Sequence, residues 1–130
     1  MAIDPRVIDN EEQGFLAMPF NIESTEGVYS LDESDIGKPV ALTANNEVSN
    51  GGDGEMFIGK LIAVSEDGSV ASVQVKGVCN DLPYSGTTPV IGWPVQMSGA
   101  GTVDKGVTEG IRNGITLAVN TGNTTCDILL

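Results

Sequence analysis

The chain of 130 residues contains no histidine and few aromatic residues. Without histidine it cannot build Ser-His-Asp or Cys-His catalytic systems, histidine metal sites, or the usual general base near neutral pH. Carboxylate chemistry remains, but the 18 acidic residues lie mostly beside Gly, Asn or Ser, as acids in turns do. The composition therefore predicts a protein that is not an enzyme and that uses no cofactor.

Basic residues are also scarce, because six Lys and Arg stand against 18 Asp and Glu and give a net charge of −12. Contacts with phosphate groups need clustered Lys or Arg, so we expect no nucleic-acid partner and no binding to an anionic membrane. No apolar run approaches the roughly 20 residues of a membrane helix. The first residues lack the basic segment and apolar core of a signal peptide, so we expect no export by that route.

Cysteine is limited to Cys79 and Cys126, which lie at the ends of predicted strands. A disulfide forms if those strands are neighbours, whereas two buried thiols are the alternative that a chain without a signal peptide favours. No metal site is expected. The loop Asn50 to Glu55, NGGDGE, has the oxygen-rich composition of a calcium loop but lacks the required spacing.

Glycine and proline, by contrast, are abundant: 17 Gly and six Pro leave no window for a long helix. The strongest local signal is the stretch from Phe57 to Cys79, FIGKLIAVSEDGSVASVQVKGVC. Asp67-Gly68 separates two apolar runs there, and this dipeptide is typical of the tight turn of a β-hairpin. We therefore predict a hairpin with one buried face.

Further short strands are expected on both sides of this hairpin, separated by polar loops at about residues 45–55 and 80–93. The expected segments are Val28 to Leu31, Lys38 to Thr43, Pro94 to Met97, Thr102 to Thr108, Ile115 to Val119 and Thr124 to Leu130. The spacing of turn residues predicts an all-β protein, a small β-barrel or sandwich of about six to eight short strands.

The first 35 residues differ from the remainder, since nine acids and one base, Arg6, give them a net charge of −8. They also carry the apolar side chains Phe15, Leu16, Met18 and Phe20. We predict an extended acidic N-terminal arm over residues 1–35, in which these four residues dock on the barrel of the same chain or on a partner, and a β-barrel domain over residues 36–130. The alternative is an edge strand at FLAMPFNI.

Trp93 is the only tryptophan and precedes a proline. It either closes one end of a small barrel or anchors an interface, because tryptophan is enriched at binding hot spots. Together with Tyr84 it would suit a third use, the stacking of a sugar ring in a carbohydrate-binding domain.

The region from Ile36 to Leu130 also resembles a known family, the capsid decoration or cement proteins of tailed bacteriophages. The segments that carry the resemblance are KPVALTANNEVSNGGDG, the hairpin FIGKLIAVSEDGSVASVQVKGVC, TPVIGWPVQMSGAGTVDKG, and GITLAVNTGNTTCDILL at the C-terminus. They cover about three-quarters of the chain and resemble that family in the order of their strands and turns.

This resemblance implies a compact β-barrel that assembles as a homotrimer on the outer surface of a phage head and stabilises the shell. The implied partners are the major capsid protein and further copies of the chain, with the capsid or subunit interface at Phe15, Leu16, Met18, Phe20 and Trp93. The implied location is the virion after synthesis in the host cytoplasm. A tail, baseplate or spike module is the alternative within phage proteins.

Overall fold

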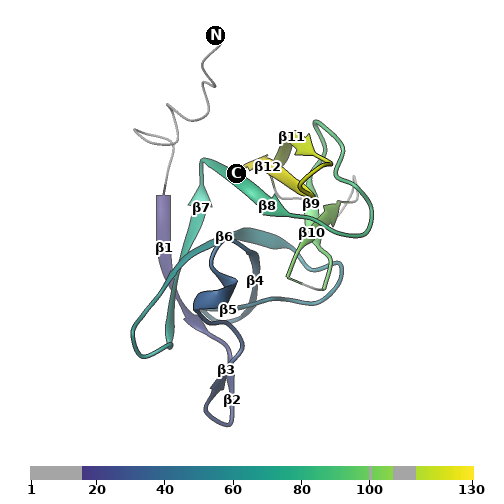
Figure 1. Ribbon diagram of the computed structural model, residues 1–130. Coiled ribbons are helices and arrows are strands. Elements are labelled where there is room, and N and C mark those ends of the chain that lie inside the picture. The colour runs from purple at the N-terminus through teal and green to yellow at the C-terminus, as the bar shows by residue number, and fades with distance from the viewer. Residues whose placement is uncertain (1–15, 100, 107–113) are drawn as a thin grey trace.

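Short β-strands make up most of the computed structural model of the protein (Figure 1), which describes residues 16–99, 101–106 and 114–130. In chain order these residues form β1 (Leu16–Ile22), β2 (Ser24–Thr25), β3 (Val28–Tyr29), the 3-10 turn η1 (Glu33–Asp35), β4 (Pro39–Ala44), β5 (Glu47–Ser49), β6 (Phe57–Val64), β7 (Val70–Lys76), β8 (Val78–Pro83), β9 (Val95–Met97), β10 (Val103–Lys105), β11 (Ile115–Asn120) and β12 (Thr125–Leu129). The predicted all-β class is confirmed, with more strands than expected. Within the same ranges, no helix has the length and apolar character needed to cross a membrane.

Five strands form a closed barrel in the order β1-β5-β4-β6-β7. Strand β1 closes it, because it pairs antiparallel with β7 and parallel with β5. Closure pairs every strand on both sides and so removes the exposed sheet edges that promote aggregation. The barrel is filled by a core of small and medium apolar side chains: Ile22, Leu31, Val40, Val48, Leu61, Ala71 and Val73.

The predicted central hairpin is confirmed as β6 and β7, joined by a turn at Asp67 and Gly68. Gly68 has φ +80°, a left-handed conformation that glycine adopts without the steric cost of a Cβ atom. The Asp67 carboxylate accepts hydrogen bonds from the backbone N–H of Ser69 at 3.0 Å and from the Ser65 and Ser69 hydroxyls at 2.7 Å. These hydrogen bonds stabilise the turn.

The C-terminal half of the chain packs on one side of the barrel (Figure 1). It contains the three-stranded sheet β11-β12-β8 and the ribbon β9-β10, and the predicted terminal hairpin is its β11-β12 pair. Ala41 of β4 and Phe57 of β6 belong to its core, so the barrel wall supports both parts of the molecule. The other members of this second core are Cys79, Leu82, Tyr84, Val95, Met97, Val103, Cys126 and Ile128.

The N-terminal segment and two expected loops differ from the sequence-based expectation. Leu16–Ile22 form a strand within FLAMPFNI, as the alternative to the arm predicted, but the strand closes the barrel and is not at an edge, so the barrel begins well before residue 36. Residues 1–15 lie outside the described part of the chain. Strands β5 and β8 occupy stretches expected to be loops, because backbone pairing with β4 and β12 there does not require an apolar sequence.

Cys79 and Cys126 are buried free thiols on the neighbouring strands β8 and β12. In the strand register Cys79 lies opposite Ile128 and Cys126 lies opposite Leu82, so the two cysteines are not directly paired. Burial raises the pKa of each thiol to about 12. Of the two alternatives, the pair of buried thiols is the one observed.

Candidate docking surface around Trp93

A tight turn from Val90 to Trp93 is fixed against the edge of strand β11. The Trp93 N–H donates to the Val90 carbonyl at 2.9 Å, and Gly92 adopts φ +84° within the turn. Thr116 of β11 then binds the turn three times. Its N–H and hydroxyl donate to the Trp93 carbonyl at 2.9 and 2.8 Å, and its carbonyl accepts from the Gly92 N–H at 2.9 Å. The turn therefore covers the beginning of the β11 edge of the three-stranded sheet.

Large apolar side chains are exposed on this turn and on the strands beside it. Ile91 at the turn is 58% exposed, and Ile115 on β11 is 47% exposed. Ile115 lies directly opposite Leu129 of β12, which is also exposed. We call the set Val90, Ile91, Trp93, Ile115 and Leu129 the Trp93 surface. Clustered exposed apolar side chains of this kind mark interaction sites more often than isolated ones.

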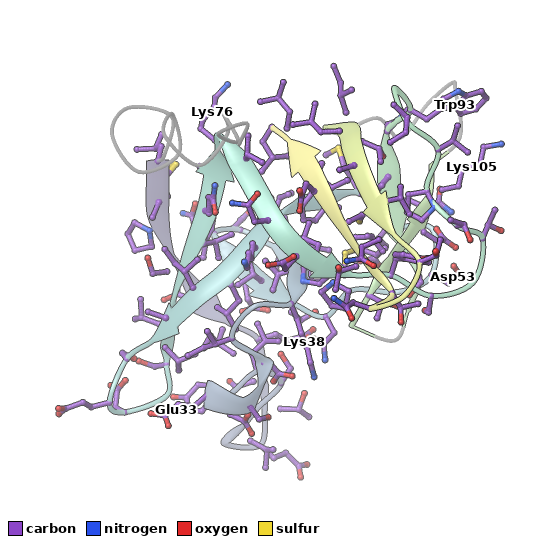
Figure 2. The ribbon with its side chains drawn as sticks, turned by 45° about the horizontal axis from the view of Figure 1, so that its top comes forward. Glu33, Lys38, Asp53, Lys76, Trp93 and Lys105 are labelled. Carbon is purple, nitrogen blue, oxygen red and sulfur yellow. The ribbon has the colours of Figure 1, made fainter. Side chains whose placement is uncertain are left out.

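Trp93 itself is half-buried, and a cation lies over its ring. Nζ of Lys105, the last residue of β10, is 4.2 Å from the ring centroid. Figure 2 shows the two side chains together, far from Glu33 at the other end of the molecule. The Trp93 backbone is bound to β11 of the three-stranded sheet and its ring contacts Lys105 of the β9-β10 ribbon, so Trp93 does not close an end of the barrel. Of the two interpretations of Trp93, the interface anchor is the one that this position favours.

The other predicted interface residues lie elsewhere. Leu16 and Met18 are exposed on β1 of the barrel, where their side chains are 48% and 43% exposed. Phe20 on the same strand packs against the barrel core instead. Phe15 lies outside the described residues. The structure thus separates the β1 residues from Trp93 (Figures 1 and 2) and does not join them into one surface.

Tyr84 is only 7% exposed and belongs to the second core. Its ring is therefore not available to stack on a sugar beside Trp93, and the arrangement suggested for a carbohydrate-binding domain is not present.

Four residues of the Trp93 surface were missed by sequence reasoning. Val90 and Ile91 sit in an apolar run, PVIGWP, inside a Pro- and Gly-rich connection, and an apolar run within a loop is a usable signal for an exposed apolar turn. Ile115 and Leu129 carry no such signal, because only the strand register brings them opposite each other.

Polar side chains beside this region do not form a cation site. Burial raises the pKa of Asp104, and the negative charge of Asp53 raises it further. A hydrogen bond from Gln96 lowers this pKa but does not offset the effect of burial. Glu55 is exposed, and backbone contacts with Met97 pair its segment of the loop with β9. Across the described ranges, His, Cys, Asp and Glu side chains form no group of three or more able to hold a metal ion.

Comparisons with protein-family models, with curated proteins and with solved structures give no significant match to the chain. A functional assignment therefore depends on the residues and their geometry.

Proposed function

We propose that the protein is a non-enzymatic structural protein of a phage virion, which decorates the outer surface of the capsid and stabilises it as a homotrimer. The observation that carries this proposal is the Trp93 surface, a set of exposed apolar residues on β11, β12 and the turn that is hydrogen-bonded to β11 and contains the only tryptophan. The resemblance of residues 36–130 to capsid decoration proteins supports the choice of partner.

The physical properties of the chain suit this task. A net charge of −12 favours solubility of the free protein before assembly. Burial of Ile91, Ile115 and Leu129 against the shell would favour binding, to the extent that it exceeds the entropic cost of association. Three linked subunits would bind the shell with high effective concentration for the second and third contacts, so each single contact can be weak.

Sedimentation with undecorated heads of the phage that encodes the protein tests the proposal. We expect the protein to pellet with the heads at micromolar concentration and to reach a saturating number of copies per head. Protein that stays in the supernatant, or that binds only to tails, would contradict the proposal and favour a tail or spike module.

A matched pair of variants tests the role of the Trp93 surface in the same assay. Ile91→Asp places a charge in the exposed turn, whereas Val28→Asp places the same charge at a 71% exposed apolar residue of β3, in the hairpin at the other end of the molecule. We expect Ile91→Asp to weaken binding about tenfold or more, as loss of a hot-spot contact does, and Val28→Asp to leave it unchanged. Equal binding by both variants would exclude the Trp93 surface.

A further inference from the structure

An open groove of about 520 Å³ lies at the end of the molecule opposite the Trp93 surface. It is bounded on one side by the segment from β3 to η1 and on the other by the end of β6 and the β6–β7 turn. Its apolar side chains are Tyr29, Leu31 and Val64, and its acidic side chains are Asp32, Glu33 and Glu66. The groove thus combines an apolar floor with a rim of carboxylates.

The aromatic side chain in the groove is held in position and still accessible. A Cβ atom added at Gly68 would lie 3.4 Å from Cδ2 of Tyr29, so the ring packs directly against the β6–β7 turn. Tyr29 nevertheless keeps 40% of its surface exposed. An exposed ring that packs against a turn is a suitable platform for a flat cationic group.

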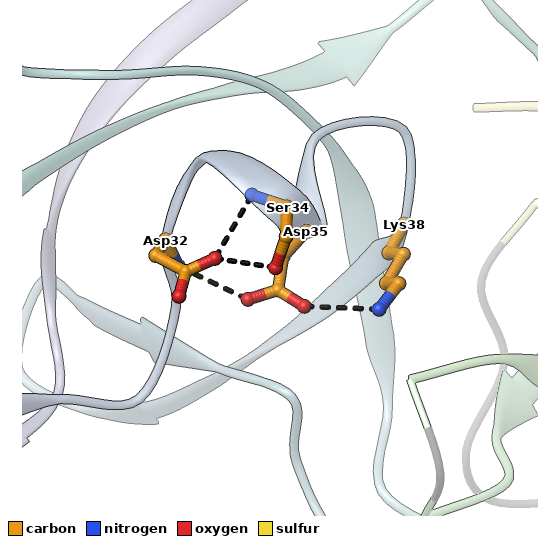
Figure 3. A network of polar contacts seen from close by, with 4 residues as sticks. All are labelled: Asp32, Ser34, Asp35 and Lys38. Carbon is orange, nitrogen blue, oxygen red and sulfur yellow. Dashed lines mark hydrogen bonds and ion pairs between the residues drawn. The ribbon is translucent and has the colours of Figure 1, made fainter.

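The carboxylates around this platform have no cation among the described residues that line the groove. The nearest Lys in sequence, Lys38, is already paired, because its Nζ lies 3.0 Å from Oδ1 of Asp35 (Figure 3). Asp32 accepts hydrogen bonds from the N–H of Ser34 at 2.8 Å and from its hydroxyl at 2.5 Å, and these bonds lower its pKa. Asp32 therefore contributes a negative charge to the groove at neutral pH.

We propose that this groove binds an arginine side chain presented by a basic segment of a partner protein. The guanidinium group is flat enough to stack on the Tyr29 ring, and its N–H groups match the carboxylates of Glu33 and Glu66. The methylene stem of the arginine would lie along Val64, as long basic side chains do on apolar surfaces. A lysine supplies the charge but neither the flat group nor the paired donors.

Charge complementarity selects another protein rather than a second copy as the occupant. The six basic residues of this chain are spread along the sequence, so a second copy offers no basic segment for the groove, whereas a basic segment of another protein is attracted to its carboxylates. This inference depends on the groove alone and holds whether or not the protein decorates a capsid.

Titration of the isotope-labelled full-length protein with short peptides, followed by NMR at low salt, tests the proposal. The probes are three peptides of Gly and Ser that carry one central arginine, lysine or citrulline. We expect the arginine peptide to shift the signals of Tyr29, Glu33, Glu66 and Gly68, to bind about threefold or more tightly than the lysine peptide, and to lose binding on replacement by citrulline. No shifts, shifts spread over all acidic residues, or equal binding of arginine and lysine would overturn the proposal.

Variants separate the groove from the general acidity of the chain. Tyr29→Ser should weaken binding of the arginine peptide about three- to fivefold, whereas Tyr29→Phe keeps the ring and should bind as the natural protein does. The double variant Glu33→Gln, Glu66→Gln should weaken it about fivefold. The double variant Asp53→Asn, Glu55→Gln removes the same charge from exposed residues of another loop and should have no effect. Equal losses in the two double variants would overturn the proposal.

Discussion

Nζ of Lys105, on β10, lies 4.2 Å from the centroid of the Trp93 ring. The only tryptophan of the chain is thus positioned twice, by backbone hydrogen bonds to β11 and by this cation over its ring. A cation over an aromatic ring at a partly exposed site stabilises a fold by about 0.5–1 kcal/mol. We expect Lys105→Met to lower the free energy of unfolding by that amount and to change the emission spectrum of Trp93. Urea unfolding followed by tryptophan fluorescence measures both.

Lys76→Met is the matched control for this prediction, because it removes an exposed cation of β7, far from Trp93. Its stability should stay within about 0.5 kcal/mol of the natural protein, and its emission should not change. If Lys105→Met has the same Trp93 emission spectrum as the natural protein, the Lys105 ammonium group does not act on the ring.

Gly59 of β6 leaves no space for a side chain beside β7. A Cβ atom added there would overlap the Gln74 carbonyl oxygen and lie 2.8 Å from Cγ1 of Val73, so the strands would have to separate. We expect Gly59→Ala to destabilise the barrel by about 2 kcal/mol or more, in the range for overpacking a dense core. Thermal and urea unfolding measure the change.

Gly52→Ala is the control for that variant. The nearest atom to its added Cβ is Oε1 of Glu55 at 3.4 Å, at the end of a flexible side chain. Stability should change by less than about 0.5 kcal/mol. If Gly59→Ala is as stable as Gly52→Ala, the spacing of β6 and β7 described above is wrong.

The Asp67 turn predicts a specific dependence of stability on pH. Hydrogen bonds from Ser69, and then from Ser65, lower the pKa of Asp67 from 3.8 to about 2. The ionised carboxylate therefore favours the folded state, and its contribution is complete above about pH 4 and is lost as the pH falls toward about 2. NMR of the carboxyl carbon should give a pKa of about 2.

Asp67→Ala should accordingly be less stable than the natural protein near pH 7, and the difference should shrink between about pH 4 and pH 2. Glu66→Ala removes the adjacent carboxylate but leaves the turn bonds of Asp67 intact. A difference between Asp67→Ala and the natural protein that stays constant over this range would contradict the role assigned to the turn.

The two buried thiols should be unreactive in the folded protein. A pKa raised from 9.0 to about 12 lowers the thiolate fraction near pH 8 by about a thousandfold, and burial also blocks access of the reagent. We expect a thiol-specific colorimetric reagent to react with Cys79 and Cys126 only after unfolding in guanidinium, and then with both. Rapid reaction of either thiol in the folded state would contradict their burial.

The parts of the fold that the sequence predicts correctly depend on local signals. Asp67-Gly68 between two apolar runs specifies the β6–β7 hairpin, and the terminal hairpin is similarly local. Closure of the barrel was not predictable in the same way, because it requires parallel pairing of β1 with β5, a three-residue strand in a polar stretch. Backbone hydrogen bonds between strands depend little on which side chains the strands carry, so such pairing is hard to predict from the sequence.

In the candidate site, too, residues with a local sequence signal were predictable and residues brought together by strand pairing were not. Trp93 is recognisable because a single indole in an apolar loop is unusual, and the structure supports its position at a surface. Ile115 and Leu129 join it only through the register of β11 with β12. The groove at Tyr29 was not predicted, because its walls come from segments more than 30 residues apart in the sequence.

Electron cryomicroscopy of heads incubated with the protein tests the central claim most directly. The proposal predicts density for the protein in threefold clusters on the outer face of the shell, with Trp93, Ile91 and Ile115 turned toward the capsid surface. Bare heads at saturating protein, or bound protein with Trp93 facing solvent, would contradict it.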